Sequence, residues 1–331
     1  MLGSSLRKLS RLGRYPLIMA ALLPVLPKPL RKAVRRFHFK RGIRQSLRQP
    51  APPVLVYATP KVASTAVTAA LQAVEGQTVF QVHMISAASI RALREGMRQR
   101  GLTRARQDMN GLEDLGVALA AALIKPRLPA RIVSLVRDPI ARNISFYFQT
   151  LDVLWKTERA HERIEVERLL AEFPDRFVHE RGIDWFDNEF KPVLGIDVYA
   201  HPFPQGKGFL RIDSAPYEVL LMRHDLDDRV KEKCLAELIG VPHVSLTPRN
   251  VGTEKSYSST YTEFLKRIEL PEDYVERMLG SKYARHFYSP EELARLRTKW
   301  LNNGRSAESV AAAAESPVLR RAGEVSRIES S

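Results

Sequence analysis

Four short apolar runs, separated by stretches with a helical pattern, most constrain the fold of this chain. The runs are VLVYA (54–58), TVFQVH (78–83), RIVSLV (131–136) and EVLLMRHD (218–225). Short runs of this kind are typical of strands that are buried on both faces, as in a parallel sheet covered by helices. We therefore expect an α/β fold with a central parallel sheet flanked by helices.

Helical patterns fill the spaces between these strands. The expected helices are 64–76, 85–101, 111–124, 137–150, 227–240, 261–268 and 290–300. Residues 190–213 carry Gly and Pro between short apolar runs, which predicts a hairpin or an irregular insertion. We divide the chain into an N-terminal arm (1–50), an α/β domain (51–304) and a disordered tail (305–331), since the tail lacks aromatic residues.

The N-terminal arm carries most of the net charge. Of the formal +15, the first 50 residues supply +13, because they hold no Asp or Glu. The apolar run at 16–26 is shorter than the ~20 residues that a membrane helix needs. We favour an uncleaved arm over a secretory signal, and we expect residues 1–48 to be attracted to an anionic membrane surface or a polyanion. A solvated, disordered arm is the alternative.

Cysteine content limits other classes of protein. Cys234 is the only cysteine, which excludes an intrachain disulfide and a cysteine zinc cluster. The chain is therefore expected in the reducing cytoplasm, where the basic arm would allow a peripheral place at the membrane, and no nucleic acid is expected as a partner. No acidic motif is placed to hold a metal.

The stretch VYATPKVASTAV (56–67) joins the first strand to the first helix. A helix beginning near Ser64 would point backbone N–H groups outward, and such a helix terminus binds anions. Lys61 adds a cation, while Ser64 and Thr65 add hydroxyl groups. The alternative is a capped surface turn.

A second loop, VRDPIARNIS (136–145), follows the third strand. Arg137 stands at the strand end, Asp138 suits the N-cap position, and Ser145 comes two turns into the helix. The carboxyl ends of parallel strands meet at one sheet edge, so both loops should present anion-binding groups there. The alternative is that Arg137 only pairs with Asp138.

The two loops together resemble the signature of sulfotransferases, which use 3′-phosphoadenosine 5′-phosphosulfate (PAPS) as the sulfuryl donor. The form TPKVAST is closest to the polysaccharide and heparan-type branch and to bacterial capsular polysaccharide synthesis proteins, which the segment IDWFDNEFKPVLGIDVYAHPF (183–203) also resembles. The resemblance extends loosely over residues 53–301. It implies a P-loop NTPase-like sulfotransferase fold and sulfuryl transfer to a hydroxyl of a glycan.

The resemblance also implies residue roles. Lys61 would contact the phosphosulfate and stabilise the leaving phosphate oxygen, and Arg137 and Ser145 would hold the 3′-phosphate. A late loop at 249–261 would help to close the nucleotide site. The residues expected to bind the donor are Pro60, Lys61, Val62, Ala63, Ser64, Thr65, Arg137, Ser145, Lys255 and Tyr257.

His83 is the candidate general base. It follows the second strand, at the same sheet edge as Lys61, and an imidazole pKa of ~6.5 suits base catalysis near neutral pH. A structural histidine at a strand end is the alternative. His201 and His224 follow later strands and could contact the acceptor.

Two other functions stay open. A kinase-like transferase would share the sheet and the phosphate loop, but it should show a Gly-x4-Gly-Lys-[Ser/Thr] loop and a metal-holding carboxylate. A non-catalytic polyanion- or membrane-binding protein would explain the basic arm alone. Trp155, Trp185 and Phe186 could stack on adenine or sugar, although core packing is the simpler interpretation.

Overall fold

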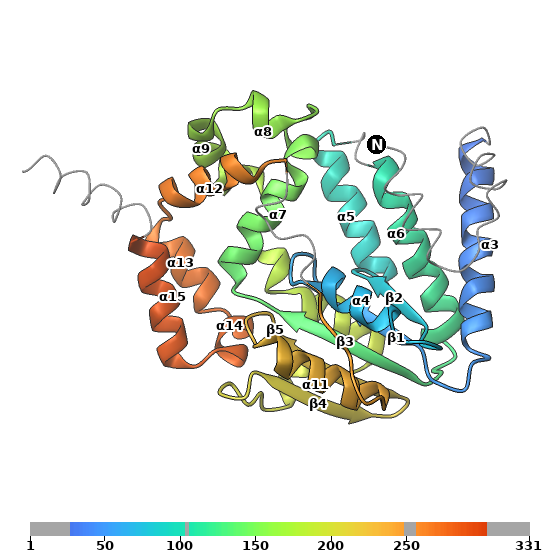
Figure 1. The fold of residues 1–331 in the computed structure, drawn as a ribbon. Coiled ribbons are helices and arrows are strands. Elements are labelled where there is room, and N and C mark those ends of the chain that lie inside the picture. Colours follow the sequence, from blue (N-terminus) through green and yellow to red (C-terminus); the bar gives the residue numbers. More distant parts are fainter. Residues whose placement is uncertain (1–26, 103–105, 248–255, 303–331) are drawn as a thin grey trace, which may run out of the picture. The chain divides into compact units, whose positions relative to one another are not determined.

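The computed structural model describes residues 27–102, 106–247 and 256–302 (Figure 1). The chain divides into two compact units. Unit 1 comprises residues 1–138 and 184–249, and unit 2 comprises residues 139–183 and 250–331. The chain therefore passes from unit 1 to unit 2, returns to unit 1, and enters unit 2 a second time.

Unit 1 is built on a five-stranded sheet of order β2-β1-β3-β5-β4. Four strands run parallel, and only β4 is antiparallel to its neighbour β5. The strands are β1 (Val54–Tyr57), β2 (Val79–Val82), β3 (Ala130–Val136), β4 (Phe209–Ser214) and β5 (Tyr217–Arg223). The predicted α/β class and the four predicted parallel strands are confirmed. The segment 190–213, predicted as a hairpin or an irregular insertion, is mostly an irregular insertion with short helical turns and enters β4 at Phe209.

The pairing register brings four strand ends to one edge of the sheet. Tyr57 pairs with Val82, and Val136 pairs with Arg223. The residues that follow β1, β2, β3 and β5 therefore lie along one edge, which we call the carboxyl edge. This edge is where parallel α/β sheets place their ligands.

Helices cover the sheet of unit 1 (Figure 1). One apolar cluster joins the side chains of Val56, Leu135 and Met222 on the sheet to Val67 of α4 and Leu235 of α11. The helical elements of unit 1 are α3 (Lys28–Ser46), α4 (Ser64–Gln72), α5 (Ala87–Gln99), α6 (Arg106–Leu119), the π-helices η1 (Ala120–Ile124) and η3 (Phe186–Phe190), α10 (Lys191–Leu194), the 3-10 turn η4 (Val198–Ala200) and α11 (Asp228–Ile239).

Helix α3 was not predicted and occupies much of the basic arm. It packs along α6, with Phe39 and Ile43 buried while Phe37 remains 63% exposed. Residues 28–46 therefore belong to the folded body of unit 1. The apolar run at 16–26 and the predicted disordered tail at 305–331 lie outside the described residues.

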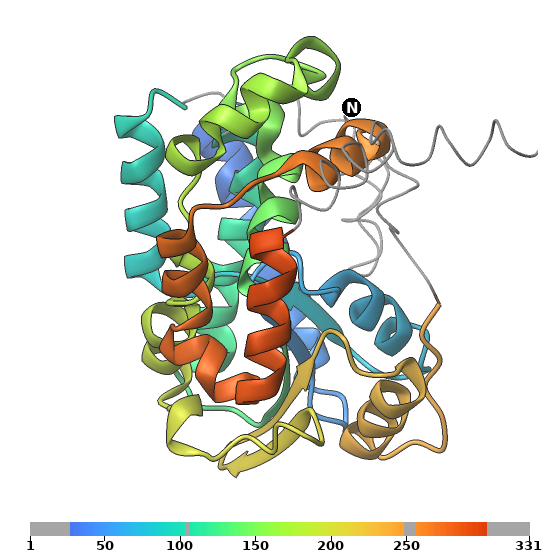
Figure 2. The same cartoon turned by 90° about the vertical axis from the view of Figure 1, so that its left-hand side faces the viewer.

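Unit 2 is helical, and Figure 2 shows its green and orange-red helices side by side. Aromatic side chains fill its core, among them Tyr147, Phe173, Phe264 and Trp300. Its helical elements are α7 (Pro139–Leu154), α8 (Ala160–Arg163), α9 (Val166–Arg176), the 3-10 turn η2 (Glu180–Gly182), α12 (Ser258–Arg267), α13 (Glu272–Leu279), α14 (Lys282–Phe287) and α15 (Pro290–Asn302). Within the described ranges, no helix is long and apolar enough to cross a bilayer.

Candidate functional site

The loop after β1 adopts an uncommon backbone conformation. Lys61 and Ala63 have positive φ angles of 73° and 65°, although neither is glycine, and the intervening Val62 is fully buried. Alternation of left- and right-handed residues turns successive N–H groups toward one side and forms a concave anion-binding backbone. Non-glycine residues in this region store strain, which clusters at functional sites.

Helix α4 begins at Ser64, as predicted, and Ala63 at its N-cap provides no side-chain cap. The first N–H groups of a helix have no partner inside the helix, so this terminus is suited to an anion. The Gln81 amide of β2 donates to Ser64 Oγ at 3.0 Å and to Thr65 Oγ1 at 3.3 Å. Because both hydroxyl oxygens accept from Gln81, their hydrogens are directed to other acceptors. Gln81 was missed, since an amide within a strand carries no motif.

Arg137 joins the two predicted loops. Its Nη1 donates to the backbone oxygen of Lys61 at 3.0 Å, which holds a guanidinium beside the anion-binding loop. The sequence pattern could place both residues at one edge but could not reveal this bond. The two loops are therefore one structural feature of the carboxyl edge.

The backbone N–H of His224 donates to the backbone oxygen of Val136 at 2.7 Å. His224 therefore lies beside Arg137, the residue that follows Val136. Burial, together with the positive charges of Arg137 and Lys231, lowers the pKa of His224 to about 4. Lys231 is itself 8% exposed and pairs with Asp228 at 2.9 Å. His224 is therefore neutral at pH 7.

The predicted base, His83, is held by one hydrogen bond at its ring and another at its backbone oxygen. Its Nδ1 lies 2.6 Å from the backbone oxygen of Ala58. A carbonyl oxygen only accepts, so Nδ1 carries the hydrogen and Nε2 carries the lone pair of the neutral ring. Trp185 Nε1 donates to the backbone oxygen of His83 at 3.0 Å.

The loop that follows His83 is anchored by Glu189, which is 2% exposed. Its Oε1 accepts from the backbone N–H groups of Ile85 and Ser86 and from the Tyr57 hydroxyl at 2.6 Å. Burial, with the nearby Glu189 carboxylate, raises the pKa of Tyr57 well above its usual value. On α6, Gly116 lies so close to the Met84 backbone that a Cβ would clash there. Glu189 and Gly116 were missed because their roles depend on contacts distant in sequence.

The remaining predicted donor residues lie outside unit 1. Ser145 lies on α7 and Tyr257 precedes α12, both in unit 2. Tyr257 packs against Phe148 and Tyr261 as part of an aromatic group. Lys255 lies outside the described residues. Trp185 and Phe186 are buried, in line with core packing.

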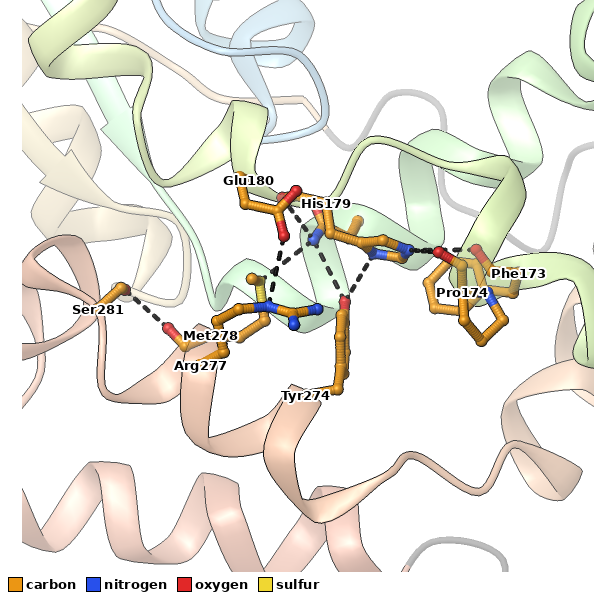
Figure 3. Close-up of polar contacts among 9 residues, drawn as sticks. Phe173, Pro174, His179, Glu180, Tyr274, Arg277, Met278 and Ser281 are labelled. Carbon is orange, nitrogen blue, oxygen red and sulfur yellow. Dashed lines mark hydrogen bonds and ion pairs between the residues drawn. The ribbon is translucent and has the colours of Figure 1, made fainter.

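A second buried polar cluster lies in unit 2 (Figure 3). His179 Nε2 faces the backbone oxygens of Phe173 and Pro174, both at 3.1 Å, so Nε2 carries the hydrogen. Nδ1 therefore accepts from the Tyr274 hydroxyl at 3.0 Å, and that hydroxyl accepts from Asn143 at 3.3 Å. Burial lowers the pKa of His179. Because both ring nitrogens have protein partners, we assign this cluster to packing between α7, α9 and α13.

Acidic and imidazole side chains do not gather into a metal centre in the described residues. Among the residues with described positions, no group of three or more His, Cys, Asp and Glu side chains is arranged to hold a metal ion.

Comparison with protein families gives a match over part of the chain. A family described as "Putative capsular polysaccharide synthesis protein" matches residues 163–289. The matched segment contains Glu189, His224, β4, β5 and α11 but not Lys61, His83 or Arg137. No curated protein and no solved structure matches the chain. The similarity supports the capsular-polysaccharide part of the predicted resemblance and leaves the sulfotransferase part as a prediction.

Proposed function

We propose that this protein is an enzyme that transfers a sulfuryl group from PAPS to a hydroxyl of a glycan. The observation that carries the proposal is the hydrogen bond from Arg137 to the Lys61 backbone, which unites a left-handed loop, a helix N-terminus and a guanidinium at one sheet edge. A ligand with phosphate groups at two separated places suits this arrangement. The proposal includes the sulfotransferase type of P-loop-like fold.

The proposed reaction is an in-line displacement at sulfur. The acceptor oxygen forms a bond to sulfur while the bond from sulfur to the phosphate oxygen breaks, leaving adenosine 3′,5′-bisphosphate. Lys61 and the N–H groups of the loop stabilise the negative charge that develops on the leaving oxygen. The acceptor proton passes to His83 Nε2, the ring nitrogen that carries the lone pair.

The glycan acceptor is proposed from the match to capsular polysaccharide synthesis proteins over residues 163–289. Arg137 would hold the 3′-phosphate, and His224 would add an uncharged hydrogen-bonding group beside it. The contribution of Ser145 rests on the resemblance alone, since Ser145 belongs to unit 2.

Calorimetric titration of the full chain tests the donor. We expect adenosine 3′,5′-bisphosphate to bind at least tenfold more tightly than 5′-AMP or ATP, and Arg137→Ala to abolish this preference. Arg127→Ala is the matched control. Arg127 precedes β3 and donates a hydrogen bond to the backbone oxygen of Ala215, at the opposite end of the strands from the carboxyl edge. Equal affinities for the bisphosphate and 5′-AMP would overturn the assignment of the 3′-phosphate, and a preference for ATP would favour a kinase-like transferase.

The base is tested separately with His83→Ala. This variant should keep bisphosphate affinity within about twofold while transfer to a glycan falls by roughly 10²–10⁴-fold, the usual contribution of a general base. His38→Ala, on helix α3, serves as the control histidine. Transfer by His83→Ala at nearly the wild-type rate would place the base elsewhere.

A further inference from the structure

A groove of about 720 Å³ lies between the edge strand β4 and helix α11 of unit 1. Figures 1 and 2 both show these two elements side by side. Its volume falls within the ~300–1,000 Å³ that is usual for ligand pockets. The residues that line the groove lie between 204 and 237, outside the loops after β1, β2 and β3.

Cations dominate the lining of the groove. Lys207, Arg211, Arg229 and Lys233 line it, against one carboxylate, Glu237. Arg211 is loosely paired, 3.6 Å from Glu218, and Lys233 lies 4.0 Å from Glu237. In the part of the chain that the structure describes, Arg229 has no ion-pair partner. The groove therefore has a net positive charge that unit 1 itself does not neutralise.

The floor of the groove is apolar. Phe209, Val230 and Cys234 contribute to it, and Lys207 Nζ lies 4.2 Å from the centroid of the Phe209 ring. The ring thus holds this ammonium over the groove by a cation–π interaction. An apolar floor with a cationic rim suits a ligand that combines apolar ring faces with negative substituents, as an acidic sugar does.

The groove starts at the carboxyl edge of the sheet. Phe209 pairs with Met222, one residue before the end of β5, and Arg229 is in the first turn of α11. A second hollow of about 350 Å³ on α11 shares Arg229, Lys233 and Glu237 with the groove. The second hollow therefore extends the groove along α11 toward Val241 and His243.

We propose that the β4–α11 groove binds an anionic stretch of the acceptor, an oligosaccharide that carries carboxylate or sulfate groups. The choice of a glycan as the ligand rests on the proposed function. The negative charge of that glycan is inferred from the cations that line the groove. Lys207, Arg211, Arg229 and Lys233 pair with successive anionic groups, while the sugar faces pack on Phe209 and Val230. The acceptor enters the site along α11.

The first test measures binding of a heparin-derived octasaccharide to the full chain. The double variant Arg229→Glu/Lys233→Glu should bind at least tenfold more weakly, and the salt dependence should decrease as two cations are lost. Arg91→Glu/Lys125→Glu makes the same charge change at exposed positions outside the groove and should stay within about twofold. Equal weakening of both double variants would overturn the proposal, because it would indicate attraction to overall positive charge.

The second test localises the ligand through Cys234, the only cysteine of the chain, which is 3% exposed and lines the groove. Alkylation by iodoacetamide is followed by intact mass above pH 8, since burial raises the pKa of this thiol. Saturating octasaccharide should slow alkylation at least fivefold in the wild type and have no effect in Arg229→Glu/Lys233→Glu. An unchanged rate in the wild type would overturn the proposal, as would equal protection by polyglutamate, which would indicate an acidic peptide.

Failure of this inference can be told from failure of the proposed function. Both double variants should retain wild-type affinity for adenosine 3′,5′-bisphosphate. Bisphosphate preference without groove binding would overturn the inference alone. Groove binding without bisphosphate preference would overturn the donor assignment alone.

Discussion

Lys61 and Ala63 occupy backbone conformations that a glycine would adopt at less cost. Their φ angles of 73° and 65° lie in the left-handed region, where an L-residue costs roughly 1–2 kcal/mol more than glycine. Lys61 supplies a charge that glycine cannot. Ala63 has an exposed methyl group that supplies no charge, so nothing comparable is lost when glycine replaces it.

We therefore predict that Ala63→Gly raises the free energy of unfolding by about 1 kcal/mol, since relief of left-handed strain exceeds the added flexibility of the unfolded chain. Urea unfolding measures this change. The control is Ala73→Gly, at an exposed right-handed residue, where glycine should lower stability by about 0.5–1 kcal/mol. Loss of stability in both variants would show that the left-handed loop is not strained.

His224 predicts a dependence of stability on pH. Its pKa is about 4 in the folded protein against about 6.5 in the unfolded chain, so between these values only the unfolded state takes up the proton. The free energy of unfolding should therefore fall as pH drops from 7 toward 4, by about 3 kcal/mol from this group. His179, whose pKa is also lowered, acts in the same direction.

Urea unfolding at pH 5 and pH 7.5 checks this dependence. His224→Asn should reduce the difference in unfolding free energy between the two pH values, whereas His243→Asn, at an exposed position, should leave it as in the wild type. An unchanged difference in His224→Asn would contradict the burial of a neutral imidazole beside Arg137.

For single residues, the sequence predicts charged groups of the site but not their backbone conformation. Lys61 and Arg137 could be predicted as site residues because each lies in a recognisable motif just after a strand. The left-handed loop could not be predicted, because it contains no glycine. The neutral state of His224 depends first on its burial and then on the charges of Arg137 and Lys231, all of which the fold determines.

At the scale of elements, the parallel strands were predictable because each is a short apolar run. Helices α8, α9, α13 and α14 were missed. Helices α8 and α14, of 4 and 6 residues, are too short to show a clear period. Helices α9 and α13 do carry an amphipathic pattern, which the prediction did not use. Helix α3 was missed because its cations led to its assignment as an arm. Its buried apolar side chains in the described part, Phe39 and Ile43, are only one turn apart.

The junction of α9 and α13 yields a prediction at this scale. Tyr274→Phe removes the hydroxyl that donates to His179 Nδ1 and accepts from Asn143, leaving buried polar atoms without a partner. We expect the free energy of unfolding to fall by about 1–3 kcal/mol. The matched control is Tyr217→Phe, whose buried hydroxyl has no hydrogen-bond partner in the described structure and should cost close to nothing. Equal losses in the two variants would indicate that packing, not hydrogen bonding, explains the effect.

At the scale of the whole molecule, the chain separates a nearly neutral body from a basic N-terminal region. Since α3 packs into unit 1, a deletion that leaves the fold intact ends at residue 26. Residues 1–26 contain four of the thirteen cations of the arm together with its apolar run.

We predict that deletion of residues 1–26 lowers cosedimentation with vesicles containing phosphatidylserine by at least threefold at low salt, because both the cations and the apolar run are lost. Vesicles of phosphatidylcholine alone are the control and should bind neither form well. Unchanged cosedimentation would show that residues 1–26 do not attract the protein to the membrane.

The repeated passage between the units has a consequence for synthesis on the ribosome. β3 pairs with β5 over seven residues, yet 80 residues separate Val136 from Tyr217. Until β5 emerges, β3 presents an open edge that can pair with another chain. Nascent chains halted between these strands should therefore depend most on chaperones, and slow translation of residues 139–216 should lower the yield of native protein.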